Sequence, residues 1–338
     1  MSPPQELPPA IEKSQAPPQE LSLLMEKCLL VCVNGAGGSG SGVICDFLSE
    51  FSTVAQYCNH SPAGGGELLQ NPVFGRGYGE FQFLRLAGGL WEFELSIAHK
   101  NQFYKSDMIK RYRATVEHWA KYCKLFNDKF QELSEKFLQK LIEFEMPAEI
   151  IVKTMPVSEF RALARQYLRE CFTESVKQFQ RPIILWDNAL GDWSWSGEDI
   201  ERKFEYFDNL KICLVWRDPR DVFAENLKFD WGKWMPQNPA DFIKYYRLTT
   251  AEFMNVKHEN VRVFRFEDIV FDYKAKTEEI MAFIGLEKED HKHPKGLFDP
   301  DKSSQNIGIW KSLMLTPLAA DIEMIHDELE SYCWEGKE

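Results

Sequence analysis

The chain lacks the features of several large classes of protein. Its 40 Lys and Arg are outnumbered by 52 Asp and Glu, and the net charge of −12 disfavours a nucleic-acid binder or a protein held on anionic lipid. No uncharged apolar run approaches the roughly 18 residues that a membrane span needs. The apolar stretch 21–33 contains Glu26 and Lys27 and follows no basic segment, so it does not resemble a signal peptide. These absences predict a cytoplasmic protein that binds neither nucleic acid nor membrane.

The sequence also lacks a recognisable metal-binding pattern. Its eight cysteines are scattered, no C-x-x-C occurs, and no Cys/His cluster has the spacing of a zinc site. Cys28, Cys32 and Cys213 lie in apolar runs, which is typical of small buried side chains. We therefore expect reduced thiols in the core, as in cytoplasmic proteins, and no metal.

The pattern along the chain predicts one ordered domain. The first 20 residues hold six prolines and few apolar residues, so we expect a disordered tail at 1–24 and a single domain at 25–338. Within that domain, apolar residues at helical spacing follow His99, and another helical pattern follows Pro156. Residues 99–180 are thus predicted to form a largely helical insertion.

Short apolar runs alternate with helical patterns through the domain. The runs 27–33, 182–186, 211–216 and 261–265 predict buried strands. Helices are predicted at 43–51, at 158–178, at 273–284 between an Asp272 N-cap and Gly285, and after Thr316-Pro317. This alternation predicts an α/β fold, a three-layer sandwich with a central parallel sheet.

The densest motif is the glycine-rich segment 34–42, which lies between the first predicted strand and a helix. Glycine lets backbone N–H groups approach a phosphate closely, and the helix N-terminus adds partial positive charge. Gly35–Gly40 fits the G-x-G-x-x-G dinucleotide pattern, but the next candidate strand, 53–58, ends in Asn59-His60 without the ribose-binding acid. The same span has the spacing of a nucleotide triphosphatase loop, but Ser41-Gly42 replaces its lysine.

A second candidate phosphate site follows the strand 211–216. Asp218 fits a helix N-cap, Pro219 the first helical position, and Asp221 a capping-box acid that reaches back to the N-cap. Arg217 then stands at the carboxyl end of a strand beside a helix N-terminus, where open α/β sheets bind ligands. Its guanidinium either binds a phosphate or pairs with one of the two aspartates.

Four segments in order resemble the sulfotransferases that use 3′-phosphoadenosine 5′-phosphosulfate (PAPS). Residues 217–222 resemble the family's segment that binds the 3′-phosphate, and the glycine loop takes the place of its 5′-phosphosulfate loop. Residues 264–286 resemble the family's strand, acidic turn and helix, and residues 302–311 resemble its late loop. The resemblance implies a P-loop-like α/β fold and transfer of a sulfuryl group from PAPS to a hydroxyl or amine of a small molecule. The product of the donor would be 3′-phosphoadenosine 5′-phosphate (PAP).

The sequence departs from this family wherever positive charge is expected. The glycine loop has no Lys or Arg, Glu225 replaces a serine, and Ser303 and Ser304 replace basic residues. Either Arg220, Lys228, Lys302 or Lys311 compensates, or PAPS binds weakly. A binding protein of this fold without turnover is therefore one alternative, and an NAD-dependent oxidoreductase built on the G-x-G-x-x-G pattern is another.

Sulfuryl transfer needs donors for the sulfonate oxygens and a base for the acceptor's proton. Asp187, which ends the strand 182–186, is the first candidate base, with His60, His99 and Asp192 as alternatives. The predicted catalytic residues are Asp187, Ser39, Ser41 and His60. The predicted PAPS-binding residues are Gly35, Gly37, Gly38, Ser39, Gly40, Ser41, Gly42, Arg217, Glu225, Lys302, Ser303 and Ser304.

Overall fold

A computed structural model describes residues 25–56, 128–143, 156–187, 197–229 and 235–336, together with residues 19 and 190. Five strands form one parallel sheet in the order β2-β3-β1-β4-β5. They are β1 (Leu29–Gly35), β2 (Val54–Gln56), β3 (Ile183–Asp187), β4 (Leu210–Trp216) and β5 (Val261–Arg265). The central strand β1 and its neighbour β4 are almost wholly buried, which explains their largely apolar sequences.

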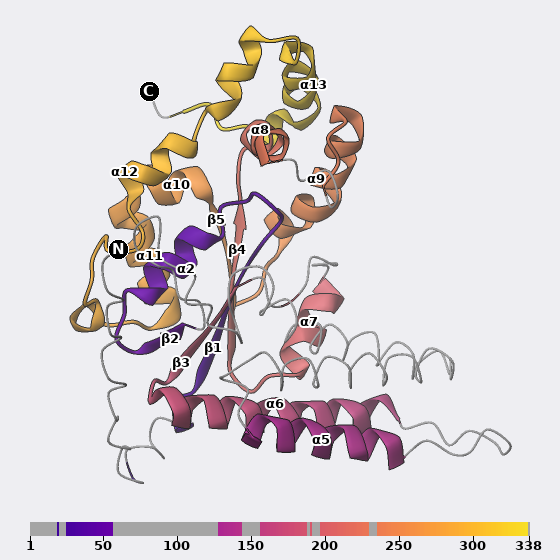
Figure 1. The fold of residues 1–338 in the computed structure, drawn as a ribbon, viewed down its shortest axis with the longest axis vertical. Coiled ribbons are helices and arrows are strands. Elements are labelled where there is room, and N and C mark those ends of the chain that lie inside the picture. Colours follow the sequence, from indigo (N-terminus) through magenta and orange to yellow (C-terminus); the bar gives the residue numbers. More distant parts are fainter. Residues whose placement is uncertain are drawn as a thin grey trace, which may run out of the picture.

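Helices cover both faces of this sheet, which confirms the predicted α/β fold (Figure 1). On one face, Val31 and Val33 of β1 and Val215 of β4 pack in a common core with α2 (Gly42–Ser49), α10 (Phe266–Phe271) and α11 (Tyr273–Ile284). On the other face, Trp186 contacts Phe172 of α6 (Val157–Phe179) and Phe207, which follows α7 (Gly197–Glu205). The sheet is therefore the middle of three layers.

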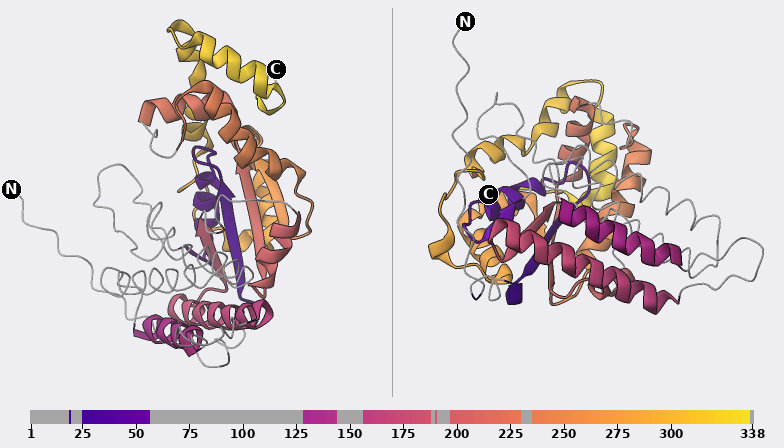
Figure 2. Two further views of the ribbon diagram at one scale, coloured as in Figure 1. Left: turned by 90° about the vertical axis from the view of Figure 1, so that its right-hand side faces the viewer. Right: turned by 60° about the horizontal axis from the view of Figure 1, so that its bottom comes forward.

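Two long helices lie beyond the amino ends of the strands. α5 (Asp128–Glu143) packs antiparallel to α6, with Phe137 stacked on Tyr167 at 4.7 Å between ring centroids (Figure 2). They are the described part of the predicted helical insertion. Residues 99–127 and 144–155 of that insertion lie outside the described residues, as do all but Gln19 of the tail 1–24.

A second apolar cluster lies at the carboxyl end of the sheet, where α8 (Pro219–Phe229), α9 (Pro239–Asn255) and α13 (Ala319–Leu329) meet. Phe223, Phe242 and Ile325 are fully buried there. This cluster fixes the start of α8, and with it the residues that follow β4. Short helical segments complete the chain: η1 (Lys288–Asp290), α12 (Pro300–Ser303), η2 (Ser304–Asn306), η3 (Ile309–Leu315) and η4 (Glu330–Tyr332).

Most predicted helices are present, but some of their ends differ from the prediction. Gly285 ends α11 with φ 88°, as predicted, but Asp272 makes no side-chain capping bond. The last helix begins at Ala319 rather than at Pro317, and Thr316 accepts a hydrogen bond from the Leu318 amide just before it. No helix in the described ranges combines the length and apolarity that crossing a membrane would take.

Candidate functional site

The glycine loop turns sharply between β1 and α2, and two of its glycines have no room for a side chain. A Cβ on Gly40, whose φ is 77°, would lie 2.4 Å from the Phe266 ring, and one on Gly35 would lie 2.8 Å from the Val215 carbonyl. Gly38 also has positive φ, at 74°. Glycine at these positions therefore lets the loop pack directly on β4 and α10.

The loop presents backbone donors at the N-terminus of α2. The Ser39 amide donates to the Ala36 carbonyl at 2.9 Å. By contrast, the amides of Gly38, Gly40 and Ser41 donate to no acceptor in the described part of the chain. Unpaired amides at a helix N-terminus form the kind of site that receives a phosphate or sulfate group.

The two loop serines, both predicted to contact the sulfonate, differ in orientation. Ser39 Oγ is buried without a hydrogen-bond partner among the described residues, and it lies 2.0 Å from where a Cβ of Gly35 would be. Ser39 therefore folds back over the end of β1. Ser41 stands at the N-cap of α2 but makes no side-chain capping bond. Its hydroxyl is accordingly the better placed of the two to donate to a ligand.

Arg217 lies where the sequence places it, at the carboxyl end of β4, next to the glycine loop. Its Nη1 donates to the Gly38 carbonyl at 3.1 Å and also to the Glu225 carboxylate, and its Nη2 donates to the Asn306 carbonyl. The guanidinium also lies 5.1 Å from the centre of the Phe266 ring. Arg217 thus joins the glycine loop, α8 and η2, and Glu225 balances its charge.

Arg220, offered above as a compensating cation, has a different role. Its guanidinium pairs with Asp218, with an Nη2–Oδ2 distance of 2.7 Å, and stacks on Trp310. Arg220 Nη2 also donates to the Trp334 carbonyl at 3.0 Å, while Asp218 accepts the Trp334 amide at 2.8 Å. The pair therefore holds the segment 330–335 against the start of α8. Asp218 also accepts the Arg220 amide at 2.8 Å, which confirms it as the N-cap.

Asp221 holds the late loop rather than its own helix end. The sequence predicts that it reaches back to the N-cap of α8. Instead its carboxylate accepts the Gly308 amide at 2.8 Å and the Trp310 amide at 3.2 Å. The prediction is wrong because these two amides come from a segment far along the chain, which local spacing does not reveal. Burial raises the pKa of Asp221, opposed by the bond from Gly308.

The basic and serine residues of the late loop lie close to one another on α12 and η2. Lys302 is largely exposed and lies 3.4 Å from the Asp299 carboxylate. Ser304 donates to the Asp301 carbonyl at 2.8 Å, and Ser303 is half-buried. The segment approaches Arg217 through Asn306. Lys302, Ser303 and Ser304 are therefore near the site, although in the described part of the chain their side chains make no hydrogen bond or ion pair with the glycine loop.

Glu267 is a buried site residue that the sequence analysis missed. It follows β5 in the first turn of α10, and its Oε1 accepts the Asp218 amide at 2.9 Å. Its Oε2 has no hydrogen-bond partner among the described residues. The available signal was its position, because residues that follow parallel strands collect at one edge of the sheet.

Of the candidate bases, the described residues include Asp187 alone. Asp187 is the last residue of β3, in register with Val33 of β1, and so lies near the start of the glycine loop. The Asn34 side chain accepts the Leu190 amide at 3.3 Å, which ties the segment after β3 to β1. Asp187 is described through its backbone alone, and His60, His99 and Asp192 lie outside the described residues.

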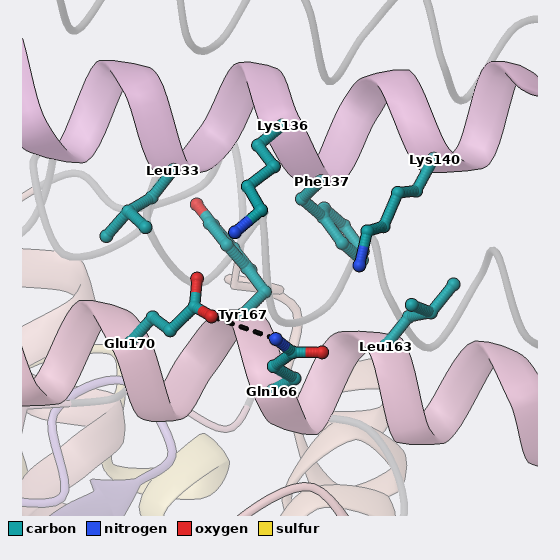
Figure 3. A pocket seen from close by; sticks show the side chains of 8 residues that line it. All are labelled: Leu133, Lys136, Phe137, Lys140, Leu163, Gln166, Tyr167 and Glu170. Atoms are coloured by element: carbon teal, nitrogen blue, oxygen red, sulfur yellow. Dashed lines mark hydrogen bonds between the residues drawn. The ribbon is translucent and has the colours of Figure 1, made fainter.

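A shallow groove elsewhere on the molecule does not belong to this site. It lies between α5 and α6 and is lined by residues such as Leu133, Lys136 and Tyr167 (Figure 3). Gln166 and Glu170 hydrogen-bond to each other along its edge at 2.9 Å. The groove lies beyond the amino ends of the strands, whereas the glycine loop and Arg217 are at the carboxyl ends.

Comparisons with known proteins give little guidance. No family model matches the chain, and no curated protein matches it. Among solved structures, the chain is similar to the sulfotransferase domain from the Synechococcus PCC 7002 olefin synthase, with a TM-score of 0.43 and 13% identity over 92% of this chain and 95% of that one. A similarity of this size establishes no shared function.

Proposed function

We propose that the protein is a sulfotransferase that transfers a sulfuryl group from PAPS to a small-molecule hydroxyl or amine. The observation that carries the proposal is the 3.1 Å hydrogen bond from Arg217 Nη1 to the Gly38 carbonyl, beside the amides of Gly38, Gly40 and Ser41, which meet no acceptor among the described residues. These amides and Arg217 offer donors to the two phosphate groups of one nucleotide. The resemblance of the segments 217–222, 264–286 and 302–311 to that family supports the choice of donor.

In the proposed reaction the residues position the donor and accept a proton. The acceptor oxygen forms a bond to sulfur while the bond from sulfur to the 5′-phosphate oxygen breaks, and PAP leaves. The loop amides and the Ser41 hydroxyl stabilise the charge that develops on the leaving phosphate and the sulfonate; losing one such donor typically costs ~3 kcal/mol in the transition state. Asp187 takes the acceptor's proton. With an amine acceptor, this base is needed less.

PAP is expected to raise the melting temperature of the protein, because a ligand at 100 times its Kd stabilises the folded state by ~2.7 kcal/mol.

Arg217→Ala is expected to weaken PAP binding at least tenfold. A charge-assisted hydrogen bond contributes ~1.5–3 kcal/mol to binding, and the variant loses such a bond to the ligand. Calorimetric titration measures the affinity, and NAD serves as the competing ligand for the oxidoreductase alternative.

Arg262→Ala is the matched control, since this exposed arginine stacks on Phe283 away from the glycine loop. Its affinity for PAP should equal that of the wild type. An absence of any shift at millimolar PAP would rule out the proposed donor, and equal losses in both variants would show that Arg217 is not the binding cation.

A binding protein without turnover is the second candidate, and the pairing of Arg217 with Glu225 favours it. The carboxylate already neutralises the cation that a phosphate would use. Glu225→Gln should therefore strengthen PAP binding about tenfold, because a charged competitor is replaced by a neutral amide of the same shape. Glu323→Gln, on the exposed face of α13, is the control. If Glu225→Gln weakens binding instead, Glu225 contributes to the site rather than competing with it.

A further inference from the structure

Glu267 links two elements on which the candidate site depends. It belongs to α10, directly after Phe266, whose ring lies under Gly40 and beside the Arg217 guanidinium. Its Oε1 holds the Asp218 amide at 2.9 Å and so fixes the junction between β4 and α8 at the residue after Arg217. The side chain is fully buried. Any change of charge on Glu267 is therefore felt at Arg217 with little screening by water.

The surroundings of Glu267 place its titration near neutrality. Burial raises the pKa of the carboxyl group to about 7, and the charge of Asp218 adds to this, whereas the Asp218 amide and the Arg217 guanidinium oppose it. From α9, Tyr246 also faces this group; its hydroxyl donates to the Arg217 carbonyl at 2.6 Å, and burial raises its own pKa well above the ordinary value. Tyr246 therefore stays neutral while Glu267 titrates.

We propose that Glu267 is a positioning residue that takes up a proton when an anionic ligand binds between the glycine loop and Arg217, and so couples the affinity for that ligand to pH. A bound phosphate or sulfate brings negative charge near a buried carboxylate, which favours the protonated form. The protonated carboxyl group still accepts the hydrogen bond from the Asp218 amide, so the junction between β4 and α8 keeps its geometry. The negative charge on Glu267, which would repel the ligand, is removed. This inference rests on the proposed binding of an anion at the glycine loop.

Calorimetric titration with PAP in two buffers of different ionisation enthalpy, at pH 7.5, tests the proposal because it counts the protons exchanged on binding. We expect the wild type to take up a substantial fraction of a proton more than Glu267→Gln, which keeps an acceptor for the Asp218 amide but cannot titrate. The ligand's own proton exchange is common to both proteins and cancels. Asp268→Asn, the next residue of the same helix, is the control and should behave as the wild type.

The pH profile gives a second readout that a purely structural role of Glu267 would not change. Between pH 6.5 and 8.5, the ratio of the Kd of the wild type to that of Glu267→Gln should rise roughly tenfold. Suppose that both proteins bind PAP, exchange equal numbers of protons, and show a ratio of Kd values that does not change with pH. That result would overturn the inference and leave the proposed function intact. If the wild type binds no PAP, the proposed function fails first.

If Glu267→Gln does not fold, the wild type and Asp268→Asn decide the question. At pH 7.5 a phosphate with a pKa near 6 is almost fully ionised, and binding to hydrogen-bond donors keeps it so, which means that the ligand itself exchanges few protons. Net uptake of protons in both proteins would then support titration of a buried protein group, and net release in both would overturn the proposal.

Discussion

Glu50→Ala is expected to lower the free energy of unfolding by about 3–5 kcal/mol, because it leaves several buried donors without an acceptor. Glu50 is fully buried at the end of α2. Its carboxylate accepts His291 Nε2 at 2.6 Å and the amides of Leu297 and Phe298 at 2.9 and 3.0 Å. These bonds attach the segment 288–298 to the end of α2. Denaturant unfolding of the purified variant measures the loss.

Glu287→Ala is the matched control, since this glutamate is exposed on the same stretch of chain and should cost under about 0.5 kcal/mol. His291 also stacks on Phe51 at 4.5 Å, so that ring is partly held without Glu50. A loss of less than about 1 kcal/mol in Glu50→Ala would mean that water or a rearranged segment satisfies the donors, and that the carboxylate does not hold the segment in place.

Asp187→Asn is expected to leave PAP affinity nearly unchanged and to reduce kcat by ~10²–10⁴, if Asp187 is the base for a hydroxyl acceptor. The amide keeps the shape of the carboxylate but cannot take a proton. Asp187 ends β3 in register with Val33 of β1, which leads into the glycine loop where the proposed donor would bind. Release of PAP from PAPS in the presence of a hydroxyl acceptor measures the rate.

Asp327→Asn, on the exposed side of α13, should turn over as the wild type does. Normal turnover by Asp187→Asn would show that Asp187 only ends the strand, and the search for the base would move to His60, His99 and Asp192. A parallel fall in PAP affinity would indicate a role in binding instead.

Most of the sheet could be predicted from the sequence because β1, β3 and β4 are almost wholly buried and have largely apolar sequences. β5 was predicted too, although it lies at the edge of the sheet, is only partly buried and contains Arg262 and Arg265. The strand order was not predicted, because it depends on which faces of the helices fit together. α9 was missed as well, although its buried residues Phe242, Ile243 and Tyr246 have helical spacing; they pack against α8 and α13.

At the candidate site, the sequence predicted where the residues lie better than it predicted which groups they hydrogen-bond to. The glycine loop and Arg217 lie at the same edge of the sheet, as expected from strands that run parallel. The distant hydrogen-bond partners of Arg220 and Asp221 could not be predicted, because they are backbone groups: the Trp334 carbonyl for Arg220, and the Gly308 and Trp310 amides for Asp221. A backbone group carries no sequence signature, so only the folded chain shows where it is used.

The contacts of Asp218 and Asp221 also set the order in which the site can form during synthesis. The glycine loop leaves the ribosome early, whereas Gly308 and Trp334 follow only after nearly all of the described chain. At about 5–20 residues per second, that interval lasts roughly 15–60 s. The glycine loop therefore stays open for that time, whereas Asp221 and Asp218, which are made later, lack Gly308 and Trp334 for roughly 4–23 s. Contacts so distant in sequence favour slow folding, so this edge of the sheet should be the last part of the fold to form.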